Sequence, residues 1–432
     1  FRHLDVESLM RRFIREGAGI IAVLFVSVVA AKFAELLRSF ILGTIEFLYG
    51  DENAVVGVGD ARVLSIAVFV TIGILLARWL NKLAQRMQPN RLGLEVIGNA
   101  ARGEGPGSSL RGTIVRSAST AVVCAAGTSI GRESAILEAG GAFGSFIGRR
   151  LWGFGPAVAA AGISAAFSAA YHAPIGGFIY VGEHLKIWSH RRAMTYAFIG
   201  AMFSHYVTVT YFDGHPIFPQ VSGDWTIGGS LVAGTVALVP SIIGARGFLR
   251  LREVVPKAAI FTKYPTPALM GAIAVSVASI ALFPEASGNG MEAIRMTGAG
   301  VSIAFALSVG FAKIVATTAT LSAKAPGGVF APTLAVTAGL ALATYMGLEK
   351  AGLDLAGTHH EVMVIAMSIG VSAGLHAPWL GAVVIAEMVG QINLIPLCMA
   401  SSFIAHQCVH ALERFEQARR ISLPKAMHDE DA

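Results

Sequence analysis

The chain has 432 residues, of which 54% are hydrophobic and only 14% charged, and its formal net charge is +6. A soluble globular domain has about one quarter charged residues, so this composition excludes an ordinary water-soluble protein. We expect a single membrane domain over 1–432, with lipid around it. Lys and Arg gather in alternate loops and in both terminal segments, as positive-inside topology requires. We therefore expect a cell (inner) membrane location with both termini cytoplasmic, and no nucleic-acid partner.

Five apolar runs reach the roughly 20 residues that cross a bilayer core. Because backbone polar groups find no water in lipid, each run is expected to be an α-helix. Three further apolar stretches are shorter and are bounded by Gly or Pro, which predicts broken helices that are buried in protein or lie beside a polar cavity. In chain order, the five long runs are 17–42, 61–84, 193–211, 227–244 and 301–321, and the short ones are 134–151, 176–188 and 379–391.

The sequence contains an internal repeat. Residues 168–183, SAAYHAPIGGFIYVGE, and 372–387, SAGLHAPWLGAVVIAE, share Ser, Ala, His, Ala, Pro, Gly and Glu in the same register. Gly-led segments that begin at 131 and 327 form a second, weaker match. Inverted repeats are common in transporters. We therefore predict an all-α polytopic membrane protein with two inverted-topology repeats of tilted and broken helices, with half-repeats at approximately 61–246 and 268–415.

Each half has a glycine-rich segment in front of a helix: GTSIGRES at 127–134 and APGGVFAP at 325–332. The start of a helix presents free N–H groups and the positive end of the helix dipole, which together favour an anion. Two such starts aimed at one point would bind an anion through partial charges and still release it. We expect the starts at Ser134 and Phe330 to converge on one cavity that contains no Lys or Arg side chain.

Glu133 is the acid at the mouth of this expected anion site. Ionisable residues within membrane segments are commonly functional. As a carboxylate, Glu133 would compete with the permeating anion for the same N–H donors, and after protonation it would stop competing and swing aside. The sequence therefore indicates a gate that opens on acidification. The alternative is a Glu that only complements the dipole of its own helix.

These segments resemble the two filter signatures of the CLC family of chloride channels and chloride/proton antiporters. The family patterns are Gly-Lys/Arg-Glu-Gly-Pro and Gly-x-Phe-x-Pro, and the likeness extends over about 93–410. The resemblance implies a homodimer with one anion pore per subunit and Glu133 as the gating glutamate. It also implies an anion pathway lined by the residues of the two signatures, which are Gly131, Arg132, Gly328, Val329, Phe330 and Ala331.

The chain departs from the family pattern at several points. The Gly-Ser-Gly-Ile-Pro segment is missing, and RLGLEVIGNAARGEGPG stands at 91–107 instead. The filter tyrosine near the C-terminus has no clear match, and Phe415 is the nearest candidate by count, without a hydroxyl. We therefore expect weaker binding at the central site, carried by backbone N–H groups. The cytoplasmic acid of proton-coupled members is replaced by His184, which either passes protons inward or has no role.

The sequence thus predicts transport of chloride or a similar small anion, either passively or in exchange for protons. The alternative is another inverted-repeat secondary transporter, for fluoride, nitrate or an organic anion. We expect no enzyme: Val364 stands where a zinc-protease motif beginning at His360 needs its second His, and no serine-nucleophile elbow is present. No cofactor and no metal are expected.

Overall fold

A computed structural model of the protein describes residues 6–89, 92–105, 107–151, 153–218, 225–297 and 301–422. Within these ranges the regular structure is helical. One isolated antiparallel β-bridge joins Gly131 and Gly328, and the described residues form no β-strand. Seven helices of the described residues are long and apolar enough to cross a membrane. The predicted all-α polytopic fold is confirmed.

All five predicted spans are helical, and the three short stretches form short or broken helices. The first half of the chain contains α1 (Val6–Tyr49), α2 (Ala54–Asp60), α3 (Val63–Met87), α4 (Leu94–Arg102), α5 (Leu110–Ala125), α6 (Glu133–Gly148), α7 (Gly155–Tyr171), α8 (Pro174–Ile179) with the π-turn η1 (Tyr180–His184), and α9 (Arg191–Tyr211). The second half contains α10 (Ile227–Val254), α11 (Ala259–Lys263), α12 (Pro265–Leu282), α13 (Met291–Met296), α14 (Ile303–Ser322), α15 (Phe330–Lys350), α16 (His359–Leu375), α17 (Pro378–Val389) and α18 (Ile395–Ser422).

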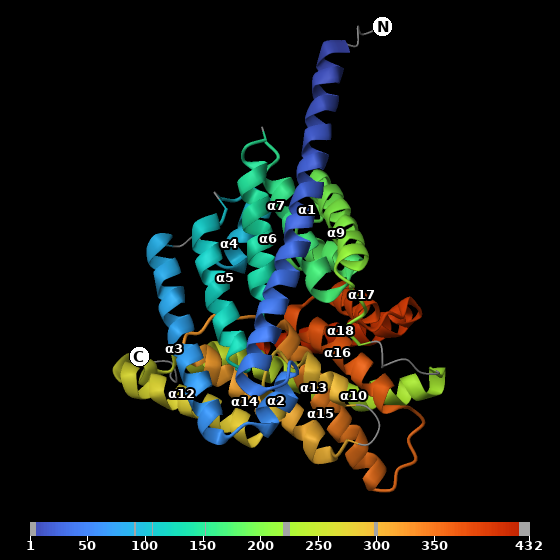
Figure 1. The fold of residues 1–432 in the computed structure, drawn as a ribbon. Helices are drawn as coiled ribbons and strands as arrows, with labels where there is room; N and C mark the ends of the chain where they lie inside the picture. The colour runs from blue at the N-terminus through green and yellow to red at the C-terminus, as the bar shows by residue number, and fades with distance from the viewer. Residues whose placement is uncertain are drawn as a thin grey trace.

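The two halves repeat the same helix packing. Helix α1 contacts α6 and α7, as α10 contacts α15 and α16; likewise α3 packs on α5 as α12 packs on α14, and α7 on α9 as α16 on α18. In Figure 1 the first half, blue to green, lies largely above the second, yellow to red. The expected pair of inverted repeats is confirmed. Because α1 and α10 are equivalent in this packing, we propose them, in place of 61 and 268, as the starts of the halves.

The sequence repeat corresponds to a repeated backbone break. Helices α7 and α16 both end at a histidine in the left-handed region, His172 with φ 52° and His376 with φ 53°. Such a conformation is uncommon outside glycine, although His adopts it more often than most residues. Pro174 and Pro378 then open α8 and α17, where the missing N–H of proline has no helical partner to lose. The two prolines therefore occupy equivalent environments.

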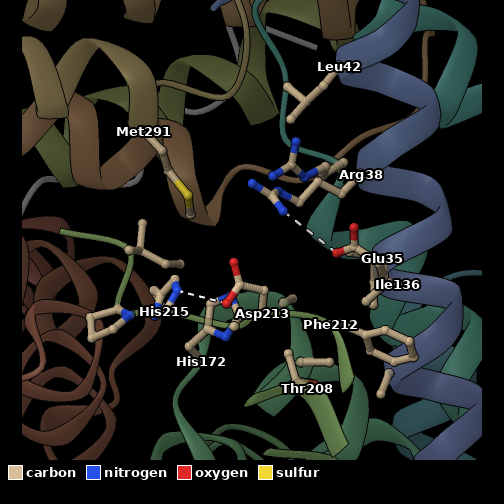
Figure 2. A pocket seen from close by; sticks show the side chains of 18 of the residues that line it. Glu35, Arg38, Leu42, Ile136, His172, Thr208, Phe212, Asp213, His215 and Met291 are labelled. Atoms are coloured by element: carbon tan, nitrogen blue, oxygen red, sulfur yellow. Dashed lines mark ion pairs between the residues drawn. The ribbon is translucent and has the colours of Figure 1, made fainter. Parts of the chain in front are cut away.

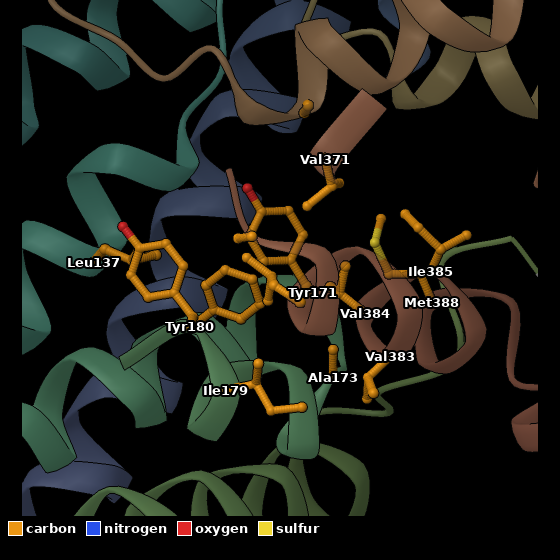
Figure 3. Packing of buried hydrophobic residues seen from close by; sticks show 14 of the residues in the cluster. Leu137, Tyr171, Ala173, Ile179, Tyr180, Val371, Val383, Val384, Ile385 and Met388 are labelled. Carbon is orange, nitrogen blue, oxygen red and sulfur yellow. The ribbon is translucent and has the colours of Figure 1, made fainter. Parts of the chain in front are cut away.

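One hydrophobic core joins both halves. Figure 3 shows part of it, where Tyr171 and Tyr180 of the first half pack near Val371 and Val384 of the second. Small residues bring the helices together: a Cβ added at Gly162 on α7 would overlap the backbone carbonyl of Gly140 on α6. Close approach through small residues is a usual source of stability for helices in lipid. This packing holds the starts of α6 and α15 in the middle of the molecule.

Candidate anion-binding site

The starts of α6 and α15 are joined by backbone hydrogen bonds. The amide of Gly131 donates to the carbonyl oxygen of Gly328 at 2.9 Å, and the amide of Gly328 donates to the carbonyl oxygen of Gly131 at 2.7 Å. A Cβ on Gly131 would lie 2.9 Å from the Gly328 oxygen, so only glycine permits this approach. The two glycine-rich segments therefore meet, as their positions in the repeats predict.

A cavity of about 380 Å³ adjoins both helix starts. We call it the aromatic cavity because a cluster of aromatic rings lines it, with centroids 4.6 to 5.9 Å apart. Ser134 from α6 and Val329 and Phe330 from α15 also face it, so the expected convergence of the two starts is observed. The rings that form the cluster are Phe167, Tyr171, Tyr180 and Phe330.

Glu133 lines the aromatic cavity and is only 3% exposed. Its Oε1 accepts a hydrogen bond of 2.6 Å from the amide Nδ2 of Asn289. Its Oε2 has no partner among the described residues. A buried polar atom without a partner is unusual and commonly marks a functional group. A carboxylate held on one side only can release its partner and turn, as a gate requires.

A second cavity, of about 160 Å³, lies on the other side of the α6 start. We call it the arginine cavity because three arginines line it, together with the three acids Glu35, Asp213 and Glu292. Figure 2 shows this cavity, with the ion pair of Arg38 and Glu35 and that of His215 and Asp213. Arg132 lines the arginine cavity, whereas its neighbour Glu133 lines the aromatic cavity. The α6 start therefore separates the two cavities. The three arginines are Arg38, Arg132 and Arg295.

A buried lysine holds the loop that carries Asn289. The Nζ of Lys313 donates to the carbonyl oxygens of Ala286 and Ser287, both at 2.9 Å, and to that of Gly288 at 2.7 Å. These bonds use all three donors of the ammonium group. A buried charge is tolerated when it is hydrogen-bonded in this way. Lys313 therefore fixes the backbone immediately before the residue that holds the Glu133 carboxylate.

A third helix start reaches the aromatic cavity where the family's serine-containing segment is missing. Leu94, the first residue of α4, lines the cavity. The amide of Gly93 is already engaged, because it donates to Oε1 of Glu138 at 2.8 Å, and Oε2 of Glu138 pairs with Arg116 at 3.0 Å. A carboxylate of the protein thus occupies an N–H group at this start that would otherwise be free for an anion.

Two other acids within the membrane region cap short helices. Glu387 accepts backbone hydrogen bonds from Ile175 and Gly176 at the start of α8, at 2.9 and 2.7 Å. Glu183 accepts from Trp379 and Leu380 at the start of α17, at 3.1 and 2.7 Å. Carboxylates at helix starts are stabilised by the free N–H groups and the helix dipole. These two acids are therefore structural caps, and Glu133 differs from them in its unpaired oxygen.

Of the other residues expected from the sequence, Gly328 and His184 line the aromatic cavity, whereas Ala331 is buried within α15. Phe415 is 69% exposed on α18 and does not line the aromatic cavity, so it does not take the place of the filter tyrosine. The expectation of a cavity without Lys or Arg is wrong, because Arg252 of α10 lines it.

Asn289 and Tyr171 were missed from the sequence. Asn289 belongs to a Ser-Gly-Asn-Gly loop whose glycines signal a turn but not a contact with Glu133. Tyr171 lies in the repeated segment, at a place where the other copy has Leu375. The two copies differ at other positions as well, so this difference alone did not single out Tyr171.

Comparison with known families agrees with this geometry. The sequence profile described as voltage gated chloride channel matches residues 73–410. The putative chloride channel protein ClcB-like of Ralstonia nicotianae is 30% identical over 70% of this chain and 73% of its own length. The H(+)/Cl(-) exchange transporter ClcA of Cronobacter sakazakii is 28% identical over 65% of this chain and 63% of its own length.

Solved structures share the fold. A slow cyanobacterial Cl-/H+ antiporter superposes with a TM-score of 0.74 at 17% sequence identity, covering 91% of this chain and 95% of that one. A CLC-type fluoride/proton antiporter superposes with a TM-score of 0.69 at 19% identity, covering 90% and 94%. At this level of identity the likeness concerns the arrangement of helices.

Proposed function

The chain belongs to the voltage gated chloride channel family, and on this premise we propose that it carries chloride or a similar small anion across a cell membrane, past Glu133. The observation that carries this proposal is the position of Glu133. Glu133 lines the aromatic cavity and its neighbour Arg132 lines the arginine cavity, at the start of α6, where backbone N–H groups favour an anion.

Glu133 gates the pathway by competing with the anion. In its ionised form the carboxylate remains at the helix starts, held by Asn289, and repels an arriving anion. In its protonated form it carries no charge, so an anion can take its place near the N–H groups. Transport therefore rises on acidification. The unpaired Oε2 supports this assignment, since it is the atom free to accept the proton.

We also propose a route by which protons reach the gate. His184 and Glu133 line the same aromatic cavity, and the ring of Tyr180 lies 5.0 Å from that of His184. An imidazole titrates near neutral pH and can pass protons. Exchange of anions for protons would then use His184 as the relay on the cytoplasmic side. If His184 has no such role, Glu133 gates a passive channel.

We also propose that both termini lie in the cytoplasm and that two chains pair as a homodimer. Apolar side chains stand exposed on or beside the two short capped helices: Ile175 on α8, Trp188 after η1 and Trp379 on α17. We propose this face as the subunit contact. Crosslinking in lipid of single cysteines placed at Trp188 and Trp379 tests it, and recovery of monomer alone would reject it.

The function is tested with purified protein in liposomes, by recording anion efflux and external pH together. Chloride efflux is expected from the parent protein and should increase as the pH is lowered. Glu133→Gln should transport at every pH at the rate that the parent reaches in acid. Glu253→Gln, an exposed acid on α10 paired with Lys257, is the matched control.

Absence of anion efflux from the parent would reject the proposed function, and equal pH profiles for the parent and Glu133→Gln would reject the gate. Proton movement that accompanies chloride in the parent and disappears in Glu133→Gln would identify an exchanger. Parallel measurements with fluoride and nitrate decide between chloride and the alternative substrates.

A further inference from the structure

Three histidines lie close together beside the aromatic cavity, which one of them, His376, lines. His376 ends α16, and His406 and His410 lie one turn apart on α18. One ring nitrogen of each histidine lies within 4.8 Å of a ring nitrogen of the other two. Among the described residues, this is the one group of three metal-ligating side chains with its ligand atoms this close together. The Nε2 atoms of His406 and His410 are 3.1 Å apart. The cluster is partly exposed and therefore accessible to an ion.

The donor set suits a first-row transition cation. Imidazole nitrogens are the common protein ligands of Zn²⁺, and tetrahedral bonds of ~2 Å would place such nitrogens about 3.3 Å apart. The distances between the ring nitrogens of the three histidines, from 3.1 Å to at most 4.8 Å, include that value. Small side-chain rotations would therefore bring the three nitrogens to one ion. Two histidines four residues apart on a helix face are a recurring zinc-binding arrangement. The Nδ1 of His406 is buried without a partner among the described residues, which leaves its Nε2 for the ion.

A carboxylate lies next to two histidines of the cluster. The Oε2 atom of Glu413 is 3.7 Å from Nδ1 of His410, and its Oε1 atom is 3.6 Å from Nε2 of His376. Arg246 on α10 holds Glu413 in place through an ion pair of 2.7 Å. A carboxylate that faces the second nitrogen of a ligating histidine orients its ring and strengthens the metal bond. Because Arg246 engages Glu413, we expect three histidine ligands and a water molecule.

We propose that His376, His406 and His410 bind one divalent first-row transition cation of the Zn²⁺ type, and that the bound cation slows anion passage. His376 lines the aromatic cavity and ends α16, so bonds from one ion to all three histidines tie this wall of the cavity to α18. The effect on transport rests on the proposed function, whereas the binding site does not. The sequence alone predicted no metal, because His376 is 30 residues away from the pair on α18.

The site is tested on the full-length chain, purified with a tag that contains no histidine and washed with a chelator. Co²⁺ is added as a spectroscopic probe, because four-coordinate Co²⁺ absorbs strongly in the visible range. We expect one Co²⁺ per chain, displaced by Zn²⁺ and not by Mg²⁺. The double variant His406→Gln/His410→Gln should lose this absorption, and His190→Gln, an exposed histidine before α9, should keep it. Glu413→Gln should weaken binding by roughly 10–100-fold.

Anion efflux is measured on the same proteins with and without Zn²⁺ on both sides of the liposome membrane. Zn²⁺ is expected to slow efflux from the parent and not from the double variant. Absence of the Co²⁺ absorption, or its persistence in the double variant, would overturn the site. A saturated site with unchanged efflux would overturn the effect on transport. If the parent carries no anion, the proposed function is rejected. The Co²⁺ spectrum still shows whether the three histidines bind a metal ion.

Discussion

Glu183 and Glu387 cap each other's neighbouring helices across the two halves of the chain. Glu387, near the end of α17, accepts hydrogen bonds at the start of α8, and Glu183, in η1 after α8, accepts them at the start of α17. The two residues occupy the same position in the sequence repeat. An inverted repeat produces such a pair when each copy supplies the carboxylate that caps a short helix of the other copy.

Removal of either cap should destabilise the fold. A hydrogen bond to a charged group contributes about 1.5–3 kcal/mol to stability, and Glu387→Gln retains one acceptor oxygen of two. We expect the free energy of unfolding in detergent to fall by about 1.5–3 kcal/mol for Glu387→Gln, and by a similar amount for Glu183→Gln. Thermal unfolding followed by size-exclusion chromatography measures this. Equal stability of Glu387→Gln and the exposed control Glu253→Gln would contradict the capping role.

Asn289 should hold the gate closed. Its amide donates the one hydrogen bond that Glu133 receives from another side chain within the described residues, and a charge-assisted bond of this kind is worth enough to change an equilibrium about tenfold. Asn289→Ala should therefore raise anion efflux at neutral pH by about tenfold. In the Glu133→Gln background the same change should have little effect, since the charge that it restrains is gone. Additive effects of the two changes would show that Asn289 acts elsewhere.

Tyr171 should replace a missing hydroxyl of the filter. It lines the aromatic cavity, and its ring lies 4.8 Å from that of Phe330. Tyr171→Phe should weaken apparent anion affinity by about 0.5–1.5 kcal/mol, the value of one hydrogen bond, and leave the maximal rate nearly unchanged. Concentration dependence of efflux measures this. Tyr345→Phe, whose hydroxyl donates to Leu355 outside the cavity, should leave affinity unchanged.

Lys313 should be required for stability. Lys313→Met would remove this donor from three buried carbonyl oxygens, of which that of Gly288 keeps the amide of Ile130 at 3.1 Å. Each of the other two groups costs about 1–3 kcal/mol when left without a donor, so we expect the free energy of unfolding to fall by at least about 2 kcal/mol. Lys257→Met, on an exposed lysine shortly after α10, provides the comparison. A Lys313→Met protein as stable as this control would show that water replaces the ammonium group.

Hydropathy predicted some of the membrane-spanning helices and missed others. Helix α1, with a mean hydropathy of 2.3 over its most apolar window, was expected as a span, whereas α12, at 1.7, was not, and α15, at 1.4, was expected only as a helix start. Helix α15 is largely buried within the protein, so Thr and Gly are tolerated where lipid would select Leu or Ile. A helix enclosed by protein can therefore escape detection by hydropathy.

The glycine motifs of the site could be predicted because a tight backbone approach restricts the residue type. Asn289 could not, because its contact with Glu133 joins segments more than 150 residues apart without a shared pattern. Phe415 was chosen by its count along the chain alone, which does not tell which side of a helix a residue occupies. Helix α18 is 28 residues long and carries Phe415 at an exposed position.

The junction of Gly131 and Gly328 is made of peptide groups alone, and this has a consequence for how the protein can change over generations. Peptide groups are present whatever the side chains are, so substitutions around the junction alter its surroundings but not its donors and acceptors, provided that no Cβ intrudes. Descendants of one ancestor can then drift far apart in residue identity while the junction persists.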